Sequence, residues 1–197
     1  MKVLGISCSP RRQRNTELLV LEGLKGAQHE GAEVEIYSVA GKNIQPCDGC
    51  DTCRETCRCH VNDDMQELYD KLLEADGIIY GTPAFFYGMT SQAKAIIDRT
   101  RCLRRPERCL VDKVAAGMVV GGSLGLISPL KDLYFYFVCN RMLPANFVAV
   151  YGDVRERPLG MKAAYDTGRQ VVQMAAQKFR YPAEFMYRSP AYGTHTL

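Results

Sequence analysis

Residues 3–28 read VLGISCSPRRQRNTELLVLEGLKGAQ, and this stretch contains the unit from which the fold is built. The apolar segment Val3–Ser7 is typical of a buried strand. A polar, arginine-rich loop follows it, and then leucines recur at helical spacing through Thr16–Gln28, as Leu18, Leu19, Leu21 and Leu24. The stretch therefore predicts a strand, a loop at its carboxyl end and an amphipathic helix.

The same alternation of strand and helix continues along the chain. Strands are predicted at Val3–Ser7, Glu33–Ser38, Gly77–Gly81, Val114–Val120 and Phe147–Tyr151. Helices are predicted at Thr16–Gln28, Asp63–Glu74, Ser91–Arg101, Leu130–Met142 and Lys162–Phe179. This pattern indicates a doubly wound α/β fold, in which helices cover both faces of a parallel sheet. We expect one domain over residues 1–180 and a C-terminal extension or arm at residues 181–197.

The composition limits the class of protein. With 197 residues, 47% of them hydrophobic, the chain can bury a full core. Its formal net charge of +3 is too small to indicate nucleic-acid binding, and no run approaches the roughly 18 apolar residues of a membrane span. Nine cysteines, an odd number, without a secretory signal favour reduced thiols or metal ligands. We therefore expect a cytoplasmic protein that binds neither nucleic acid nor membranes.

Five of the nine cysteines lie in one short run, CDGCDTCRETCRC, at residues 47–59. Spacers of two residues turn the backbone and point successive thiolates inward, as in the cluster loops of bacterial ferredoxins. Structural zinc sites more often pair two short cysteine hooks across a long gap. The spacing favours an iron–sulfur cluster, while a zinc site and a redox-active or disulfide-forming patch remain open alternatives.

The loops that follow the first, third and fourth strands are unusual. Ligands of doubly wound proteins bind at the carboxyl ends of the strands. The first loop, residues 7–16, offers hydroxyls, guanidinium groups and a helix N-terminus, which suit a phosphate dianion. It contains neither a Walker A motif nor G-x-G-x-x-G. The alternative is that Ser9 and Thr16 only cap a helix while the arginines face water.

The third-strand loop, residues 81–90, is aromatic and bracketed by glycines. It suits a planar ring that needs a flat wall and backbone hydrogen bonds, although core packing of the aromatic side chains is an equal alternative. The fourth-strand loop, residues 121–125, reads GGSLG and would let the backbone approach a ligand closely.

Four segments together resemble the iron–sulfur flavoproteins, a branch of the flavodoxin-like NAD(P)H-dependent FMN reductases. They are GISCSPRRQRNT, PCDGCDTCRETCRCHVNDDM, ADGIIYGTPAFFYGMTSQAKAIIDR and VVGGSLG. The resemblance implies a flavodoxin-like sandwich with a five-stranded parallel sheet of order 2-1-3-4-5. It also implies a cluster-binding loop at residues 44–62, inserted after the second strand.

The resemblance implies two cofactors, FMN and a [4Fe–4S] cluster. The implied phosphate-binding residues are Ser7, Ser9, Arg11, Asn15 and Thr16. The implied isoalloxazine-binding residues are Pro83, Ala84, Phe85, Phe86, Tyr87 and Gly88, with Gly121, Gly122 and Ser123 closing the other side. The implied cluster ligands are Cys47, Cys50, Cys53 and Cys59. Cys59 fits the fourth place better than Cys57, because it keeps the family's distance to residues 63–65.

Cys8 and the pair Asp98–Arg99 lead to separate expectations. Cys8 stands where the family usually has glycine, so we expect its side chain near the phosphate loop, where it would hinder close backbone approach. Asp98 and Arg99 match a DR pair of the family, for which we expect a structural or interface role.

The resemblance implies a redox enzyme without acid–base catalytic residues. Electrons would come from ferredoxin or a similar low-potential donor, pass through the cluster to FMN, and reduce a small acceptor such as oxygen, peroxide or a quinone. The alternatives are an NAD(P)H-dependent FMN or quinone reductase without a cluster, and a flavodoxin-like redox-sensing module. A homodimer or homotetramer is expected by the same resemblance.

Overall fold

Five parallel strands form the centre of the computed structural model, which describes residues 1–104 and 109–185. They are β1 (Lys2–Ser7), β2 (Glu33–Ser38), β3 (Gly77–Phe85), β5 (Val114–Gly121) and β7 (Val148–Tyr151). Their spatial order is β2-β1-β3-β5-β7, which is the predicted flavodoxin-like order. Two further strands of two residues each join the sheet: β4 (Gly88–Met89) pairs antiparallel with β3, and β6 (Leu143–Pro144) pairs parallel with β5.

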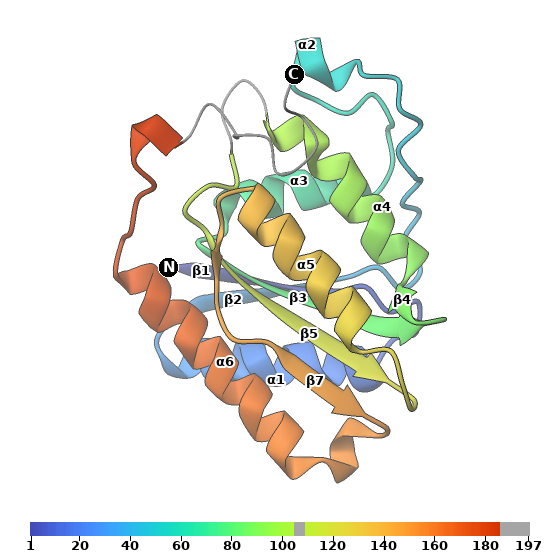
Figure 1. Ribbon diagram of the computed structural model, residues 1–197, viewed down its shortest axis with the longest axis vertical. Coiled ribbons are helices and arrows are strands. Elements are labelled where there is room, and N and C mark those ends of the chain that lie inside the picture. Colours follow the sequence, from blue (N-terminus) through green and yellow to red (C-terminus); the bar gives the residue numbers. More distant parts are fainter. Residues whose placement is uncertain (105–108, 186–197) are drawn as a thin grey trace.

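Helices cover both faces of this sheet (Figure 1). They are α1 (Asn15–His29), α2 (Cys53–Thr56), α3 (Met65–Glu74), α4 (Ser91–Arg99), α5 (Ile127–Cys139) and α6 (Pro158–Ala176). α1 and α6 pack on one face and α3, α4 and α5 on the other, each layer with its own buried cluster. Between and after these helices, the described residues also form the 3₁₀ turns η1 (Thr100–Arg104), η2 (Val154–Glu156) and η3 (Ala183–Phe185).

The crossing of α1 and α6 depends on small residues. A Cβ atom on Gly168 would lie 1.7 Å from the carbonyl oxygen of Gly23, and one on Gly26 would lie 1.9 Å from that of Tyr165. Any side chain at these glycines would therefore push the two helices apart. This close contact fixes α1, and with it the helix N-terminus at the carboxyl edge of the sheet.

Several boundaries differ from the prediction. β3 continues four residues past Gly81, beyond the point where β1 ends, because Thr82 and Pro83 pair with β5 and the next two residues pair with β4. α5 and α6 start earlier than predicted, with Pro129 in the first turn of α5 and Pro158 as the first residue of α6. Proline is tolerated there because first-turn N–H groups have no partner within the helix. The last two helices also end three residues early, at Cys139 and Ala176.

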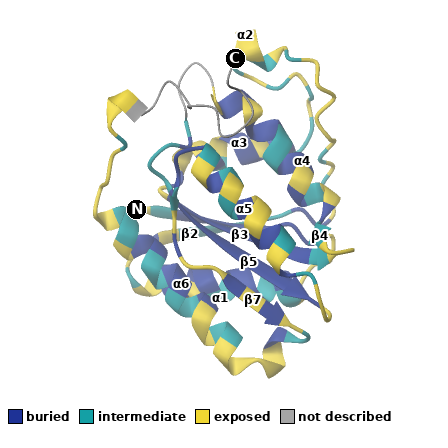
Figure 2. Ribbon diagram, viewed as in Figure 1, coloured by how far each residue is buried: buried dark blue, intermediate teal, exposed yellow. Residues whose placement is uncertain are grey.

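The cysteine-rich loop at residues 44–62 leaves the sheet after β2 and returns at α3. The loop contains the short helix α2, which the sequence did not predict. Figure 2 shows that the loop lies largely on the surface, whereas the strands of the sheet are mostly buried. Of the predicted C-terminal arm, residues 186–197 lie outside the described part of the chain. Within that part, no helix has both the length and the apolar character that crossing a membrane requires.

Candidate functional site

A cavity of about 200 Å³ opens at the carboxyl end of the sheet. The loops after β1, β3, β5 and β7 meet around it, at the point where the strand order reverses between β1 and β3. Its lining consists of Ser9, Arg11, Arg14, Asn15, Thr16, Pro83, Ala84, Phe85, Val120, Gly121, Gly122 and Gly152. The structure thus brings the three predicted ligand loops together on one edge.

The N-terminus of α1 forms the polar end of this cavity. Its N-cap residue, Arg14, makes no side-chain capping hydrogen bond, so N–H groups of the first turn are left for an anion. Arg11 and Arg14 add positive charge, and no acidic side chain is among the lining residues. Arg12 is directed elsewhere, since its guanidinium donates to the carbonyl oxygen of Ala40 at 3.1 Å. These features fit a phosphate group, as the predicted phosphate loop requires.

The other end of the cavity is apolar and is built from two neighbouring strands. Pro83 and Ala84 lie on the extended end of β3, beside the end of β5. Pro83 lacks an N–H donor, but β1 has ended at this level, so no ladder bond to β1 is lost. A Cβ atom on Gly122 would meet nothing within 4 Å, which leaves open space beside the cavity. A flat ring fits between such walls.

Some predicted residues lie outside this cavity. Ser7, Phe86, Tyr87, Gly88 and Ser123 are not among its lining residues. The Ser7 hydroxyl is fully buried and has no hydrogen-bond partner in the described residues. Phe86 and Tyr87 form the turn between β3 and β4 with positive φ angles of 50° and 66°, and Phe86 is fully exposed.

Three lining residues were missed by the sequence argument: Arg14, Val120 and Gly152. Arg14 belongs to the predicted phosphate loop, and its position directly before the α1 helix is the signal that could have identified it. Gly152 follows β7, and its carbonyl oxygen accepts a hydrogen bond from the Asn15 side chain at 2.9 Å. This contact ties the β7 end to the start of α1, and it joins residues 137 positions apart.

The expectation for Cys8 was wrong. Its side chain is fully buried in the core cluster beside Tyr80, and burial raises the pKa of the Cys8 thiol to about 12. Its backbone N–H donates to the Gly81 carbonyl, and its own carbonyl accepts from the Thr90 hydroxyl. The thiol therefore packs inward and does not obstruct the phosphate loop.

The cysteine-rich loop encloses a second, much smaller cavity of about 20 Å³. Its lining includes all four predicted cluster ligands, Cys47, Cys50, Cys53 and Cys59. Cys57 is not among the lining residues. It lies at the end of α2 with a left-handed φ of 57°, and its N–H bonds the Cys53 carbonyl.

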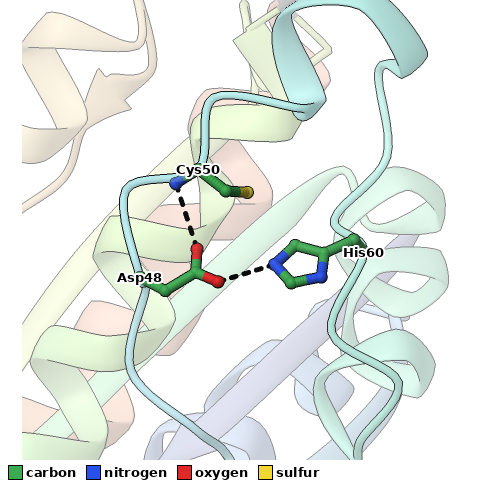
Figure 3. A group of neighbouring side chains, drawn as sticks. All are labelled: Asp48, Cys50 and His60. Carbon is green, nitrogen blue, oxygen red and sulfur yellow. Dashed lines mark hydrogen bonds and ion pairs between the residues drawn. The ribbon is translucent and has the colours of Figure 1, made fainter.

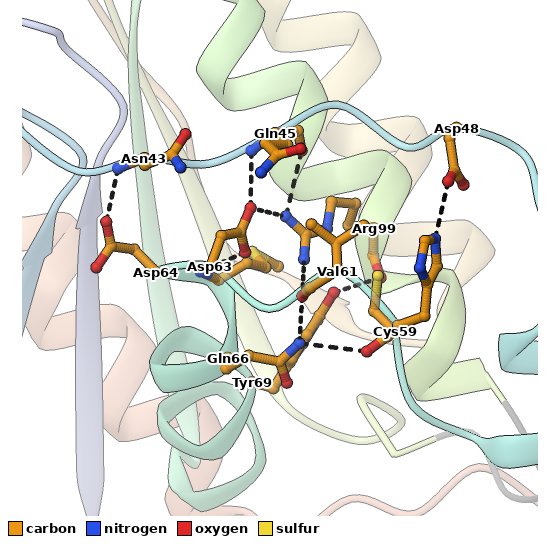
Figure 4. A network of polar contacts seen from close by, with 12 residues as sticks. Asn43, Gln45, Asp48, Cys59, Val61, Asp63, Asp64, Gln66, Tyr69 and Arg99 are labelled. Carbon is orange, nitrogen blue, oxygen red and sulfur yellow. Dashed lines mark hydrogen bonds and ion pairs between the residues drawn. The ribbon is translucent and has the colours of Figure 1, made fainter.

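Both ends of this loop are held by a buried ion pair, Arg99 with Asp63 (Figure 4). Neither side chain is exposed to solvent. Arg99 also donates to the carbonyl oxygens of Gln45 at 3.2 Å and Val61 at 3.1 Å, before and after the cysteines. Burial alone would raise the pKa of Asp63, but hydrogen bonds from Arg99 and from the amides of Gln45 and Met65 outweigh it and keep that pKa below its usual value.

A second contact closes the loop on its exposed side. Asp48 accepts a hydrogen bond from the Cys50 amide at 3.1 Å, and its other oxygen is 2.8 Å from Nε2 of His60 (Figure 3). The Cys50 amide and thiol, followed by His60, lower the pKa of Asp48 to about 2. The contact joins the first cysteine pair to the residue after Cys59.

Comparison with known proteins identifies the family of the chain. The family model of NADPH-dependent FMN reductases matches residues 1–153. An iron–sulfur flavoprotein of Methanocaldococcus jannaschii is 36% identical over 188 residues, which cover 88% of this chain and 97% of that protein. An iron–sulfur flavoprotein of Methanosarcina thermophila is 33% identical, with 90% of this chain and 93% of that protein covered.

Solved structures agree with the fold. A flavone reductase superposes with a TM-score of 0.74 at 26% identity, covering 90% of this chain and 64% of the other. An NAD(P)H:quinone oxidoreductase from Methanothermobacter marburgensis reaches 0.68 at 14% identity, which supports the fold alone. The chain therefore belongs to the NADPH-dependent FMN reductase family and, within it, to the iron–sulfur flavoproteins, and it is an FMN-dependent oxidoreductase.

Proposed function

We propose that this protein transfers electrons from ferredoxin or a similar low-potential donor to a small acceptor such as oxygen, peroxide or a quinone. Its cofactors would be FMN in the larger cavity and a [4Fe–4S] cluster on Cys47, Cys50, Cys53 and Cys59. Two one-electron donors would supply two electrons, which together with two protons convert a quinone to a hydroquinone. When bound, a cluster exchanges single electrons and a flavin exchanges one or two.

The observation that carries this proposal is the common cavity of the four cysteines. A zinc ion held by tetrahedral thiolates needs sulfur atoms about 3.8 Å apart, because Zn–S bonds are about 2.3 Å long. Among the described residues no three cysteine thiols lie within 4.8 Å of one another; the set that meets this limit is Asp48, Cys50 and His60. The thiols are thus not gathered at zinc-binding distances, while all four predicted cluster ligands line one cavity. The 2.8 Å contact of His60 with Asp48 explains the mixed set without a metal.

The larger cavity supports FMN binding because its lining has a polar end for the phosphate and an apolar end for the ring. Ser9, Arg11, Arg14, Asn15 and Thr16 would hold the phosphate, at an uncapped helix N-terminus without acidic neighbours in the lining. Pro83, Ala84, Phe85, Gly121 and Gly122 would hold the ring. A role for Ser7, Phe86, Tyr87, Gly88 or Ser123 stays a prediction.

A second donor is favoured by one finding. The matching family model is that of NADPH-dependent FMN reductases, so NADPH is the alternative source of electrons, delivered as hydride directly to the flavin. In that case the cysteine loop would not take part in reduction of the flavin.

Self-association into a homodimer or homotetramer is a further part of the proposal. Phe86 is fully exposed, Tyr87 is 62% exposed and Ile127 is 80% exposed. Phe86 and Tyr87 are neighbours in the turn between β3 and β4, with ring centroids 6.4 Å apart, and contiguous exposed apolar side chains mark surfaces that another protein can cover. A second copy covering this turn would bury both rings.

Anaerobic stopped-flow kinetics can separate the two donors. Wild-type protein and the Cys53→Ala variant are each mixed with reduced ferredoxin or with NADPH, and bleaching of the flavin is followed. The proposal predicts fast reduction by ferredoxin in the wild type and its loss in the variant. Equal rates with NADPH in both proteins, together with no reaction of the wild type with ferredoxin, would instead establish the cluster-independent reductase.

A further inference from the structure

We infer that Arg99 is a positioning residue for the cluster, whose Nε–H donates a hydrogen bond to the sulfur of Cys59 once that thiolate is a ligand. This inference rests on the proposed assignment of Cys59 as the fourth ligand. It gives Arg99, the second residue of the DR pair, a role in addition to holding the loop in shape.

The first observation is an incomplete set of hydrogen bonds. A guanidinium has five N–H donors and no acceptor, and burying one without partners is costly. Arg99 Nη1 donates to Asp63 and to the Gln45 carbonyl, and Nη2 donates to the Val61 carbonyl. Nε is fully buried and has no partner among the described residues. Three of the five N–H donors are thus used, and Nε is the one nitrogen of this buried guanidinium that bonds none of the described residues.

The second observation is where this cation lies. Arg99 and Cys59 line the same small cavity, together with the other three predicted ligands. The buried Nε–H group and the Cys59 side chain thus belong to the same small cavity, and a thiolate is a stronger acceptor than a thiol.

The remaining neighbours of Arg99 do not use Nε. The Tyr69 hydroxyl and the Cys102 thiol both donate to the Arg99 backbone carbonyl, at 3.2 Å and 3.3 Å. Gln66 donates to the carbonyls of Val61 at 2.6 Å and Cys59 at 3.2 Å (Figure 4). Arg99 and Gln66 thus both donate to carbonyl groups of the loop backbone, and of these two only Arg99 carries charge and a spare N–H donor.

The two functions of Arg99 have different consequences. Its bonds to Gln45 and Val61 hold the loop in shape before the cluster binds, which favours assembly. A hydrogen bond to a ligand sulfur stabilises the reduced, more negative cluster and so raises its reduction potential. Gln66 shares the first function and not the second, which makes Gln66→Met a matched control.

The test compares cluster potentials by anaerobic redox titration followed by electron paramagnetic resonance. In Arg99→Lys, which keeps the positive charge and removes Nε, we expect the ratio of reduced to oxidised cluster at a fixed potential to fall about tenfold, equivalent to about 59 mV. In Gln66→Met the amount of cluster falls but its potential stays that of the wild type. An unchanged potential in Arg99→Lys, or an equal shift in Gln66→Met, would overturn the inference.

A second measurement needs no change at Arg99. Protein labelled with ¹⁵N-arginine should show coupling between an arginine nitrogen and the reduced cluster in pulsed electron paramagnetic resonance. The coupling should persist in Arg101→Gln, which removes the other arginine lining the cavity. If the wild-type protein holds the cluster but shows no such coupling, the role of Arg99 is refuted and the proposed function is not. If the wild-type protein contains no iron and sulfide, the proposed function itself is refuted.

Discussion

The buried pair of Arg99 and Asp63 makes a quantitative prediction for Asp63→Asn. One Asp63 oxygen accepts from Arg99 and from the Gln45 amide at 2.8 Å, and the other accepts from the Met65 amide at 3.1 Å. An asparagine replaces one of these acceptors by an NH₂ donor and removes the negative charge. Arg99 would then be a buried cation without a counter-ion.

The cost follows from the burial of both side chains. Removing one partner of a buried ion pair costs about 3–5 kcal/mol, because the other charge remains uncompensated. Small domains have about 5–15 kcal/mol of stability in total, so the variant should fold but lose a large share of it. The neighbouring Asp64→Asn is the matched control. The Asp64 carboxylate lies at a partly exposed residue and accepts from the Asn43 amide at 2.6 Å, so we expect a loss below about 1 kcal/mol.

The assay is urea unfolding of the cofactor-free protein under reducing conditions, repeated from pH 7 to pH 3. Because the pKa of Asp63 is lowered by folding, the stabilisation is complete above the unfolded value of about 4 and is lost as the pH falls through the folded value. The gap between wild type and Asp63→Asn should therefore be widest at pH 7 and narrow below about pH 4. A gap under about 1 kcal/mol at pH 7, or one independent of pH, would refute the reasoning.

Two further predictions concern the flavin cavity and the helix crossing. Arg14→Gln should weaken FMN binding about tenfold to a hundredfold, the worth of a charge-assisted hydrogen bond, and leave riboflavin binding unchanged. The control is Arg12→Gln, which should leave FMN affinity near that of wild type, because the Arg12 guanidinium bonds the Ala40 carbonyl. Equal losses of FMN affinity in the two variants, measured by isothermal titration calorimetry, would count against the phosphate site. Gly168→Ala should lower the free energy of unfolding by about 3 kcal/mol or more, because its Cβ would lie 1.7 Å from a backbone oxygen. Gly122→Ala, with nothing within 4 Å, should change it by less than about 0.5 kcal/mol, and similar losses in both variants would contradict the close helix contact.

Periodicity and alternation were sufficient to predict the doubly wound fold class and most elements, because burial on a parallel sheet leaves a strong apolar pattern, whereas the strand order followed from the family resemblance. They did not predict the ends of those elements whose length depends on contacts with other parts of the chain. Residues 82–85 contain a proline and look like a loop, yet they extend β3 because the first two pair with β5 and the last two with β4. The helices predicted from Leu130 and Lys162 begin earlier, and Pro129 and Pro158 each lie in the first turn of a helix.

For the candidate site, the sequence predicted the cluster ligands but not the contacts that hold them in place. Cysteine spacing and family resemblance selected four thiols that the structure gathers around one cavity. The contacts that hold them could not be predicted, since Arg99 meets Asp63 across 36 residues and Asn15 meets Gly152 across 137. Nor does the sequence indicate that Phe86 would point into solvent, because its apolar character fits a core and a ring-binding loop equally well.

Iron and acid-labile sulfide analysis of anaerobically purified protein tests the central claim most directly. The wild type and Cys57→Ala should each contain FMN with about four iron and four sulfide per chain, and Cys59→Ala should lose the cluster while keeping FMN. Retention of the cluster in Cys59→Ala with its loss in Cys57→Ala, or one zinc per chain in place of iron, would contradict the account.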